Sequence, residues 1–183
     1  MARPLASDFL HSMRFQVKLS CENAALVNSF TGSPEAGFNN VSTPEATVEA
    51  VEYKEGTDIY TRKYPGNPSM SDCTLSRGVA VQRAGFWQWV RQIMEGVGDY
   101  RGELQINHYH RTGFMTRSFP GNYPGEMASA NPDRLGTPDR RYTLFEAFPI
   151  RCKIAGDLDA TSSEISLEEI DVSYEYFDLE EAA

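Results

Sequence analysis

Apolar and polar residues alternate through most of the chain with the period of two that is typical of β-strands. In the segment RFQVKLS, Phe15, Val17 and Leu19 fall on one face, and polar residues occupy the other. Pro149 cannot donate a hydrogen bond within a sheet, so it indicates a bulge or an edge position in its strand. Similar patterns predict further strands at about 47–53, in CTLSRGVAV (73–81), in GELQINHYHR (102–111) and in TLFEAFPIRCKI (143–154).

One segment has the period of a helix instead. In RAGFWQWVRQIMEG (83–96), Phe86, Trp87, Val90 and Met94 share one face at helical spacing. Gly96 is a natural C-terminal stop. The pattern predicts one amphipathic α-helix, at about 83–96, that flanks the sheet and covers the core.

The segment SEISLEEIDVSYEYF (163–177) predicts a long strand near the C-terminus. Its apolar residues change phase at Glu168 and Glu169, and a β-bulge there would keep them all on one face. The opposite face would then be an acidic stripe that includes Glu164, Asp171 and Glu175. A solvated outer face explains such a stripe without any further function.

Three segments lack a clear period. Residues 52–69 (EYKEGTDIYTRKYPGNPS) begin as a strand, end as a turn, and carry charges and tyrosines between. Residues 115–141 are rich in Pro, Gly and Asn and predict a long loop between two strands, of a length that usually binds something or is disordered. Residues 178–183 predict a short acidic C-terminal tail.

Composition indicates one domain. The 183 residues, 40% of them hydrophobic, suffice for one well-packed domain that spans 1–183, whereas two domains would each have a thin core.

Charge and cysteines limit the classes of function. The net charge of −9 is the opposite of the basic excess that binds nucleic acid. No signal peptide or membrane span is expected, because the apolar runs are short. The three cysteines are widely spaced, as in proteins with reduced structural thiols.

The best candidate for chemistry is the pair His108 and His110, which two-residue spacing on a strand places on one side. With Gly102, this spacing begins the first metal motif of cupin barrels. A cupin also needs a Glu four or five residues later, where Phe114 and Met115 stand, and a further downstream His. The chain has only three histidines and none lies downstream.

Other chemistries have less support. The sequence contains no nucleophile elbow, P-loop or dinucleotide-binding glycine motif. Cys152 follows Arg151, but no histidine is placed to activate it, and a buried structural thiol explains it better. We therefore expect no enzymatic activity, no catalytic residue, no metal site and no cofactor.

Four short motifs are each weak alone, but their order and spacing make the set specific. They are EYKEG (52–56), KYPG (63–66), LSRGV (75–79) and a series that runs from AFP to DLDATSSEI (147–165). Together they resemble the tail-tube proteins of contractile phages and of extracellular contractile injection systems, which are related to the type VI secretion tube protein. The resemblance covers most of residues 15–177. Two segments are longer than in the family's pattern, residues 21–36 and 115–141.

The resemblance implies a fold and an assembly. The fold would be mainly β, a β-barrel or sandwich of antiparallel strands with one flanking helix. Hexameric rings would stack into a hollow inner tube, with neighbouring sheets joined into one inner barrel. Implied partners are further copies of the chain, sheath and baseplate proteins, and a DNA or protein cargo in the lumen. The chain would assemble in the cytoplasm into a virion tail or injection particle, and the free subunit would not bind membranes.

The resemblance also gives residues 52–69 a role, as the extended loop that leaves one ring and packs on the next. Charges could pair across that interface, and tyrosines supply large contact areas. A solvated hairpin is the alternative. The predicted ring-stacking residues are Tyr53, Lys54, Glu55, Asp58, Tyr60, Arg62, Lys63 and Tyr64.

The acidic stripe gains a second interpretation in a tube. If its face lines the lumen, Glu164, Asp171 and Glu175 would repel a polyanion, so that DNA or an acidic cargo could slide without adhering.

Three alternatives remain at this point. The chain could form a tube-initiating ring at the baseplate, with the same fold and different partners on its two faces. It could be a cupin-like metal-dependent enzyme, or a hexameric binding module that never polymerises.

Overall fold

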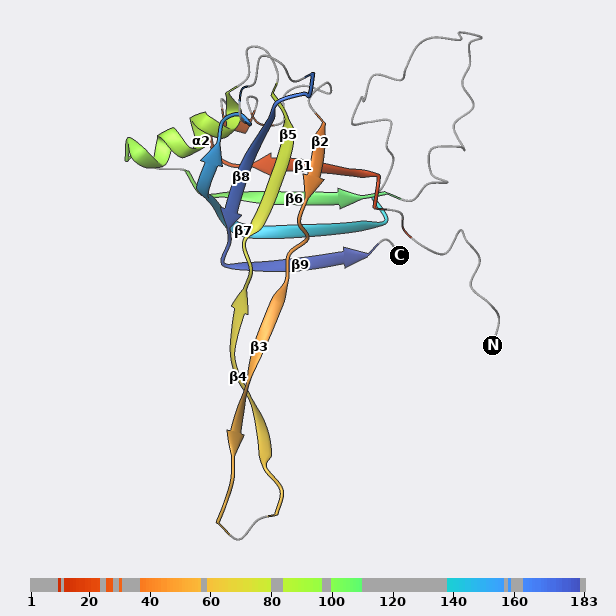
Figure 1. Ribbon diagram of the computed structural model, residues 1–183, viewed down its shortest axis with the longest axis vertical. Helices are drawn as coiled ribbons and strands as arrows, with labels where there is room; N and C mark the ends of the chain where they lie inside the picture. The colour runs from red at the N-terminus through yellow and green to blue at the C-terminus, as the bar shows by residue number, and fades with distance from the viewer. Residues whose placement is uncertain are drawn as a thin grey trace, which may run out of the picture.

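In the computed structural model, the described residues are 10, 12–23, 26–27, 30, 37–56, 59–79, 84–96, 100–109, 138–156, 158 and 163–181. They form a body of two β-layers, one helix, and a two-stranded hairpin that projects from the body (Figure 1).

The first layer is a four-stranded antiparallel sheet in the order β1-β6-β7-β9. Alternation fixes its register, because Val17 lies opposite Ile106 and Leu104 lies opposite Leu144, all four buried. Its strands are β1 (Phe15–Ser20), β6 (Gly102–His108), the first part of β7 (Arg140–Lys153) and β9 (Tyr176–Glu181).

The second layer consists of β2 (Phe38–Val41), β5 (Cys73–Gly78), β8 (Leu167–Ser173) and the last part of β7. Strand β7 therefore belongs to both layers. It turns from one to the other near Glu146, whose φ of 54° is unusual for a residue other than glycine. A register shift between Pro149 and Arg151 confirms the predicted bulge.

The mainly antiparallel β fold with one helix is confirmed. The described strands form a sandwich, and the path β1-β6-β7-β8-β5-β2 does not close into a barrel among them.

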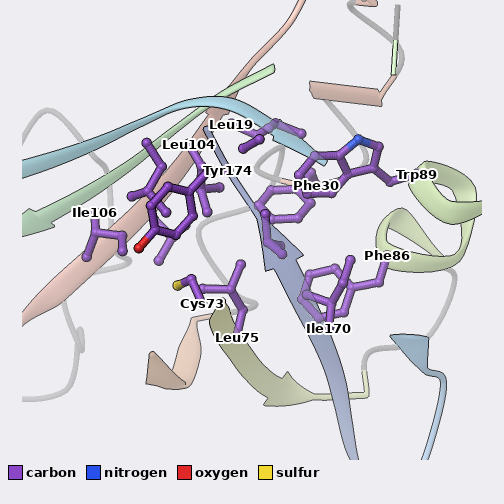
Figure 2. Close-up of a cluster of buried hydrophobic side chains, with 14 of the residues drawn as sticks. Leu19, Phe30, Cys73, Leu75, Phe86, Trp89, Leu104, Ile106, Ile170 and Tyr174 are labelled. Atoms are coloured by element: carbon purple, nitrogen blue, oxygen red, sulfur yellow. The ribbon is translucent and has the colours of Figure 1, made fainter. Parts of the chain in front are cut away.

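The core lies between the two layers (Figure 2). Leu19 and Leu104 from the first layer meet Leu75 and Ile170 from the second. Cys73 is fully buried here, and burial raises the pKa of its thiol to about 11. Its Sγ donates a hydrogen bond to the carbonyl oxygen of Ser42 at 3.0 Å, as expected of a structural thiol.

Helix α2 (Gly85–Met94) covers one end of the core, but with a different face from the one predicted. Phe86 and Trp89 are fully buried, whereas Trp87 is 38% exposed and Met94 is 71% exposed. Trp89 lies three residues after Phe86, so both point inward. Its indole Nε1 donates a hydrogen bond to the carbonyl oxygen of Tyr100 at 2.6 Å, which satisfies its only polar group.

Most of the described residues between 52 and 69 lie in strands. Strands β3 (Ala46–Tyr53) and β4 (Arg62–Met70) pair in a hairpin that carries most of the segment, so the turn predicted at the end of the segment is wrong. The hairpin passes the β9 side of the body and extends away from it (Figure 1). Strand β4 tolerates Pro65 and Pro68 because this two-stranded sheet has only edge strands.

The C-terminal segment also differs from its prediction. Strand β8 pairs with β5 in unbroken register, so the predicted bulge at Glu168 and Glu169 is wrong. The chain then turns into β9, which contains residues 178–181 of the predicted tail. No helix within the described ranges is long and apolar enough to cross a membrane.

Candidate functional site

The β3–β4 hairpin has two chemically different faces. Residues that lie opposite one another in an antiparallel pair share a face, which places Val51 with Tyr64 and Tyr53 with Arg62 on one side. Glu52 and Lys63 share the other side, where Lys63 Nζ lies 3.1 Å from Glu52 Oε1. The hairpin therefore has one face with Val51 and the tyrosines, called the apolar face below although Arg62 also lies on it, and a charged face with the pair Glu52 and Lys63.

No layer of the described body covers the apolar face. Val51, Tyr53 and Tyr64 are each about half exposed, at 51%, 53% and 52%. A single two-stranded hairpin is at best marginally stable alone in water. Contiguous exposed apolar side chains are typical of interaction sites, which makes this face a candidate for one.

A bulge gives the hairpin its shape. The register shifts between Val48 and Ala50, opposite the stretch that contains Gly66. A Cβ atom at Gly66 would lie 2.9 Å from the carbonyl oxygen of Glu49 and 3.1 Å from Val51 Cγ2. Glycine is required here because the two backbones approach closely.

The predicted ring-stacking residues all belong to this arm where the structure describes them. Tyr53 ends β3, and Arg62, Lys63 and Tyr64 begin β4. The connection between the strands carries Lys54, Glu55 and Tyr60, while Asp58 lies outside the described residues.

Sequence reasoning missed the apolar residues of the arm, Val48, Val51 and Ile59. Ile59 is 86% exposed close to the tip. The available signal was the segment VEAVEY (48–53), in which apolar residues fall on both faces of the strand.

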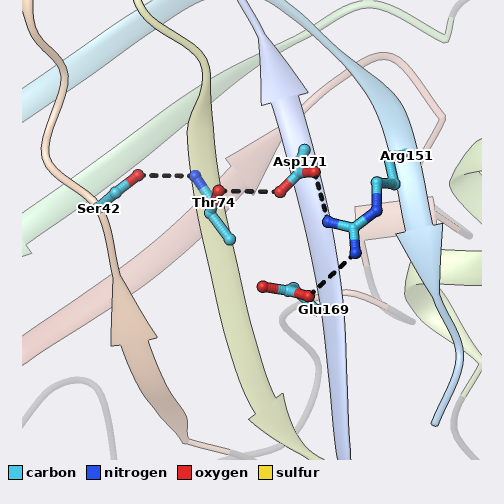
Figure 3. Close-up of polar contacts among 5 residues, drawn as sticks. All are labelled: Ser42, Thr74, Arg151, Glu169 and Asp171. Carbon is cyan, nitrogen blue, oxygen red and sulfur yellow. Dashed lines mark hydrogen bonds and ion pairs between the residues drawn. The ribbon is translucent and has the colours of Figure 1, made fainter. Parts of the chain in front are cut away.

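The predicted lumen residues do not form one stripe. Asp171 lies on the face of β8 that points away from the core, in a network that crosses four segments (Figure 3). Its Oδ1 accepts a hydrogen bond from Thr74 Oγ1 at 2.8 Å, and its Oδ2 accepts one from Arg151 Nη1 at 2.8 Å. Arg151 also lies 3.5 Å from Glu169, and these contacts raise the pKa of the guanidinium, the hydrogen bond to Asp171 most of all. The charge of this acidic pair is therefore partly neutralised.

The other two acidic residues lie elsewhere. Glu175 is in the turn between β8 and β9, where its carboxylate pairs with Arg101, and Arg101 also lies 3.5 Å from Glu146. Glu164 precedes β8 and is exposed. Lining of a lumen by Glu164, Asp171 and Glu175 stays a prediction.

A buried ion pair replaces the predicted bulge. Arg77 of β5 and Glu168 of β8 lie directly opposite each other, and their side chains are only 1% and 5% exposed. Arg77 Nε donates to Glu168 Oε1, and Arg77 Nη1 donates to the carbonyl oxygen of Phe30 at 3.1 Å. The guanidinium also lies 4.1 Å from the centre of the Phe86 ring. Glu168 lies two residues before Ile170, so both side chains point to the same face of the strand. That spacing was the sequence signal for the burial of Glu168.

The histidine pair is only half described. His108 ends β6, and His110 lies outside the described residues. Within the described part of the chain, no three residues among His, Cys, Asp and Glu are grouped so that they could hold a metal ion.

Comparison with known proteins identifies the class. The family model described as T4-like virus tail tube protein gp19 matches residues 11–178. The chain belongs to this tail tube protein family, and it is a structural subunit of a tube. A search of curated protein sequences finds no significant match.

Solved structures show the same fold. A chain in the cryo-EM structure of the anti-feeding prophage (AFP) baseplate is 19% identical, with a TM-score of 0.68 over 99% of this chain and 98% of that one. A chain in the sheath-tube complex of the extracellular contractile injection system PVC is 18% identical, with a TM-score of 0.69 over 97% and 95%. A crystal structure of an Hcp protein is more distant, at 9% identity and a TM-score of 0.51 over 92% and 98%.

Proposed function

We propose that copies of this chain form hexameric rings, and that the rings stack into the hollow inner tube of a contractile injection particle, either a phage tail or a phage-tail-like machine. The observation that carries this proposal is the β3–β4 hairpin, a long arm with an uncovered apolar face in a member of the tail tube family. Such an arm suits a subunit that is completed by its neighbours.

In this proposal the hairpin packs on the next ring. Its apolar face would be buried by another copy, and the charges of its other face and tip would pair at the rim of the interface. The residues concerned are Tyr53, Lys54, Glu55, Asp58, Tyr60, Arg62, Lys63 and Tyr64, to which the structure adds Val48, Val51 and Ile59.

The partners follow from the same assembly. A sheath would surround the tube, a baseplate would hold one end, and DNA or a protein effector would pass through the lumen after assembly in the cytoplasm. The PVC structure contains a sheath-tube complex, which supports the sheath as a partner. The role is structural, without enzymatic activity.

The lumen residues give a testable prediction. Replacing Glu164, Asp171 and Glu175 by Gln or Asn removes three negative charges in every subunit. Because a negative wall repels a polyanion, we expect assembly to remain intact while passage of DNA or acidic cargo slows. A delivery assay with the assembled particle measures this, and unchanged delivery would count against a role for these residues in the lumen.

The same triple variant needs a stability control. Asp171 and Glu175 also pair with Arg151 and Arg101, so a loss of these exposed pairs could lower stability slightly. Circular dichroism melting of the isolated subunit separates that effect from a change in delivery.

Negative-stain electron microscopy over a concentration series tests the function itself. We expect rings at low protein concentration and hollow tubes at high concentration. A monodisperse monomer at all concentrations would contradict the proposal.

A second role has one supporting observation. The AFP chain with the same fold comes from a baseplate structure. A tube-initiating ring would therefore appear in the same experiment as rings that never stack.

A further inference from the structure

Exposed apolar side chains also gather away from the hairpin, at the far end of the second layer, where β5 and β7 end and β8 begins (Figure 1). Ser166 ties these strand ends together. Its carbonyl oxygen accepts a hydrogen bond from Val79 N at 2.9 Å, and its Oγ accepts one from Gly156 N at 3.1 Å. The apolar side chains at this end are 40% to 79% exposed, and they are called the distal patch below: Val79, Ile154, Ile165 and Leu167.

The distal patch interrupts an otherwise polar face of the second layer. Leu167 points to the same side of β8 as Glu169 and Asp171, away from the core. Ile165 lies two residues earlier, and a Cβ atom at Gly78 would lie 3.6 Å from its Cγ2. The outer face is therefore apolar at its far end, whereas the polar network of Asp171 covers it nearer the hairpin (Figure 3). Contiguous exposed apolar side chains of this kind are typical of interaction sites.

The distal patch and the hairpin lie at opposite ends of the molecule. At the root of the hairpin, Ser71 N donates a hydrogen bond to the carbonyl oxygen of Glu45 at 3.0 Å. Strand β5 starts just after this root and runs away from the hairpin to Gly78, beside the distal patch (Figure 1). Two different surfaces at opposite ends of one chain can join copies head to tail, and such a contact can repeat along an axis.

The two surfaces match in chemistry. The apolar face of the hairpin offers tyrosine rings, and the distal patch offers aliphatic side chains, which together form a typical interface core. Charges of opposite sign stand beside both. Arg62 lies on the same face as Tyr53, and Glu164 directly precedes Ile165. In a contact between copies, these charges would favour the correct orientation from the rim of the interface.

We propose that the distal patch is the surface on which a hairpin from the adjacent ring buries its apolar face. This inference rests on the proposed tube function and names the receptor for the hairpin, a second copy of this chain. The contact is head to tail. A tube built in this way presents hairpins at one end and distal patches at the other, so its two ends differ.

Ile154→Ser combined with Ile165→Ser tests the receptor surface. Both side chains are more than half exposed, so the subunit should stay folded, which circular dichroism melting checks. Each contact between stacked subunits should weaken about tenfold for each isoleucine lost, and electron microscopy should show rings without tubes. Ile165→Ser alone, at the most exposed position of the distal patch, should show the same effect in weaker form.

The matched control is Ile150→Ser. Ile150 is 51% exposed in the same layer, but it follows Pro149, which lies opposite Val172 at the hairpin end of β8. This variant should form normal tubes.

A mixing experiment tests the head-to-tail contact itself. Rings of Y53S/Y64S keep an intact distal patch, and rings of I154S/I165S keep an intact hairpin. Neither should form tubes alone. When the two are mixed, the intact hairpins of one should bind the intact patches of the other, and stacks of two rings should appear that do not grow further. Electron microscopy measures the stack length.

The outcomes separate this inference from the proposed function. Two-ring stacks in the mixture, with rings alone in each separate sample, would support it. Normal tubes from I154S/I165S would overturn the distal patch as the receptor and leave the tube function intact. Rings that stay single in the mixture would also overturn it, because hairpin and patch would then not bind each other. A wild-type chain that stays monomeric would overturn the tube function as well.

Discussion

Glu168→Ala is expected to destabilise the isolated subunit by about 3–5 kcal/mol, because it leaves the Arg77 guanidinium buried without its counter-charge. This is a large part of the roughly 5–15 kcal/mol by which a domain is stable. The Phe86 ring and the Phe30 carbonyl would still contact Arg77, but neither is an anion. Urea unfolding followed by circular dichroism measures the change.

Two variants sharpen this prediction. Glu95→Ala removes an exposed ion pair with Arg91 on helix α2, where both side chains are about half exposed, and should cost less than about 1 kcal/mol. The double variant R77M/E168L replaces the buried pair by apolar side chains of similar size. It should recover most of the stability lost in Glu168→Ala, because no charge then remains buried. If Glu168→Ala and Glu95→Ala lower the free energy of unfolding equally, the buried pair contributes no more to stability than the exposed one.

Tyr53→Ser combined with Tyr64→Ser is expected to abolish stacking of rings while the subunit stays folded. Both tyrosines lie on the uncovered face of the hairpin and contribute little to the body's own core. If each is an interface anchor worth about 2 kcal/mol, stacking should weaken by roughly a thousandfold. Electron microscopy should then show rings without tubes, and the melting temperature of the subunit should hardly change.

The matched control lies on the other face of the same arm. Glu52→Gln with Lys63→Gln removes an exposed ion pair and leaves the tyrosines in place. Such pairs contribute about 0–1 kcal/mol, so tubes should still form. Normal tubes from the tyrosine variant would mean that the apolar face does not carry the contact between rings.

Strands with one buried face could be predicted from the sequence. Alternation in FQVKL and LQI gave β1 and β6, because each places every second residue in the core. Strand β4 has no such pattern, since its residues are almost all exposed and two are prolines. With neither face buried, the usual signal of a strand is absent.

The buried ion pair could not be predicted from the sequence for a related reason. Arg77 and Glu168 lie at core positions in two adjacent strands. A prediction that assigns every charged residue to the surface therefore places both of them on the wrong face of their strands. In β8 this forced a bulge that the structure does not have. The pairing between the strands, with Arg77 directly opposite Glu168, decides the matter, and a single segment does not contain that information.

The helix shows the limit of periodicity at short range. The apolar residues of this segment fit two overlapping helical faces, 86/87/90/94 and 86/89/90/93, so the period alone does not decide which tryptophan is buried. The position of Tyr100, whose carbonyl accepts the indole hydrogen bond of Trp89, selects the second. That contact comes from a loop eleven residues away in sequence.

A cryo-EM reconstruction of the tubes formed by the purified chain would test the central claim most directly. The account predicts a hollow tube of stacked rings in which the apolar face of each β3–β4 hairpin, with Val51, Tyr53 and Tyr64, is buried against a copy in the adjacent ring. A map in which the hairpins extend into solvent, or a preparation that never forms rings, would contradict it.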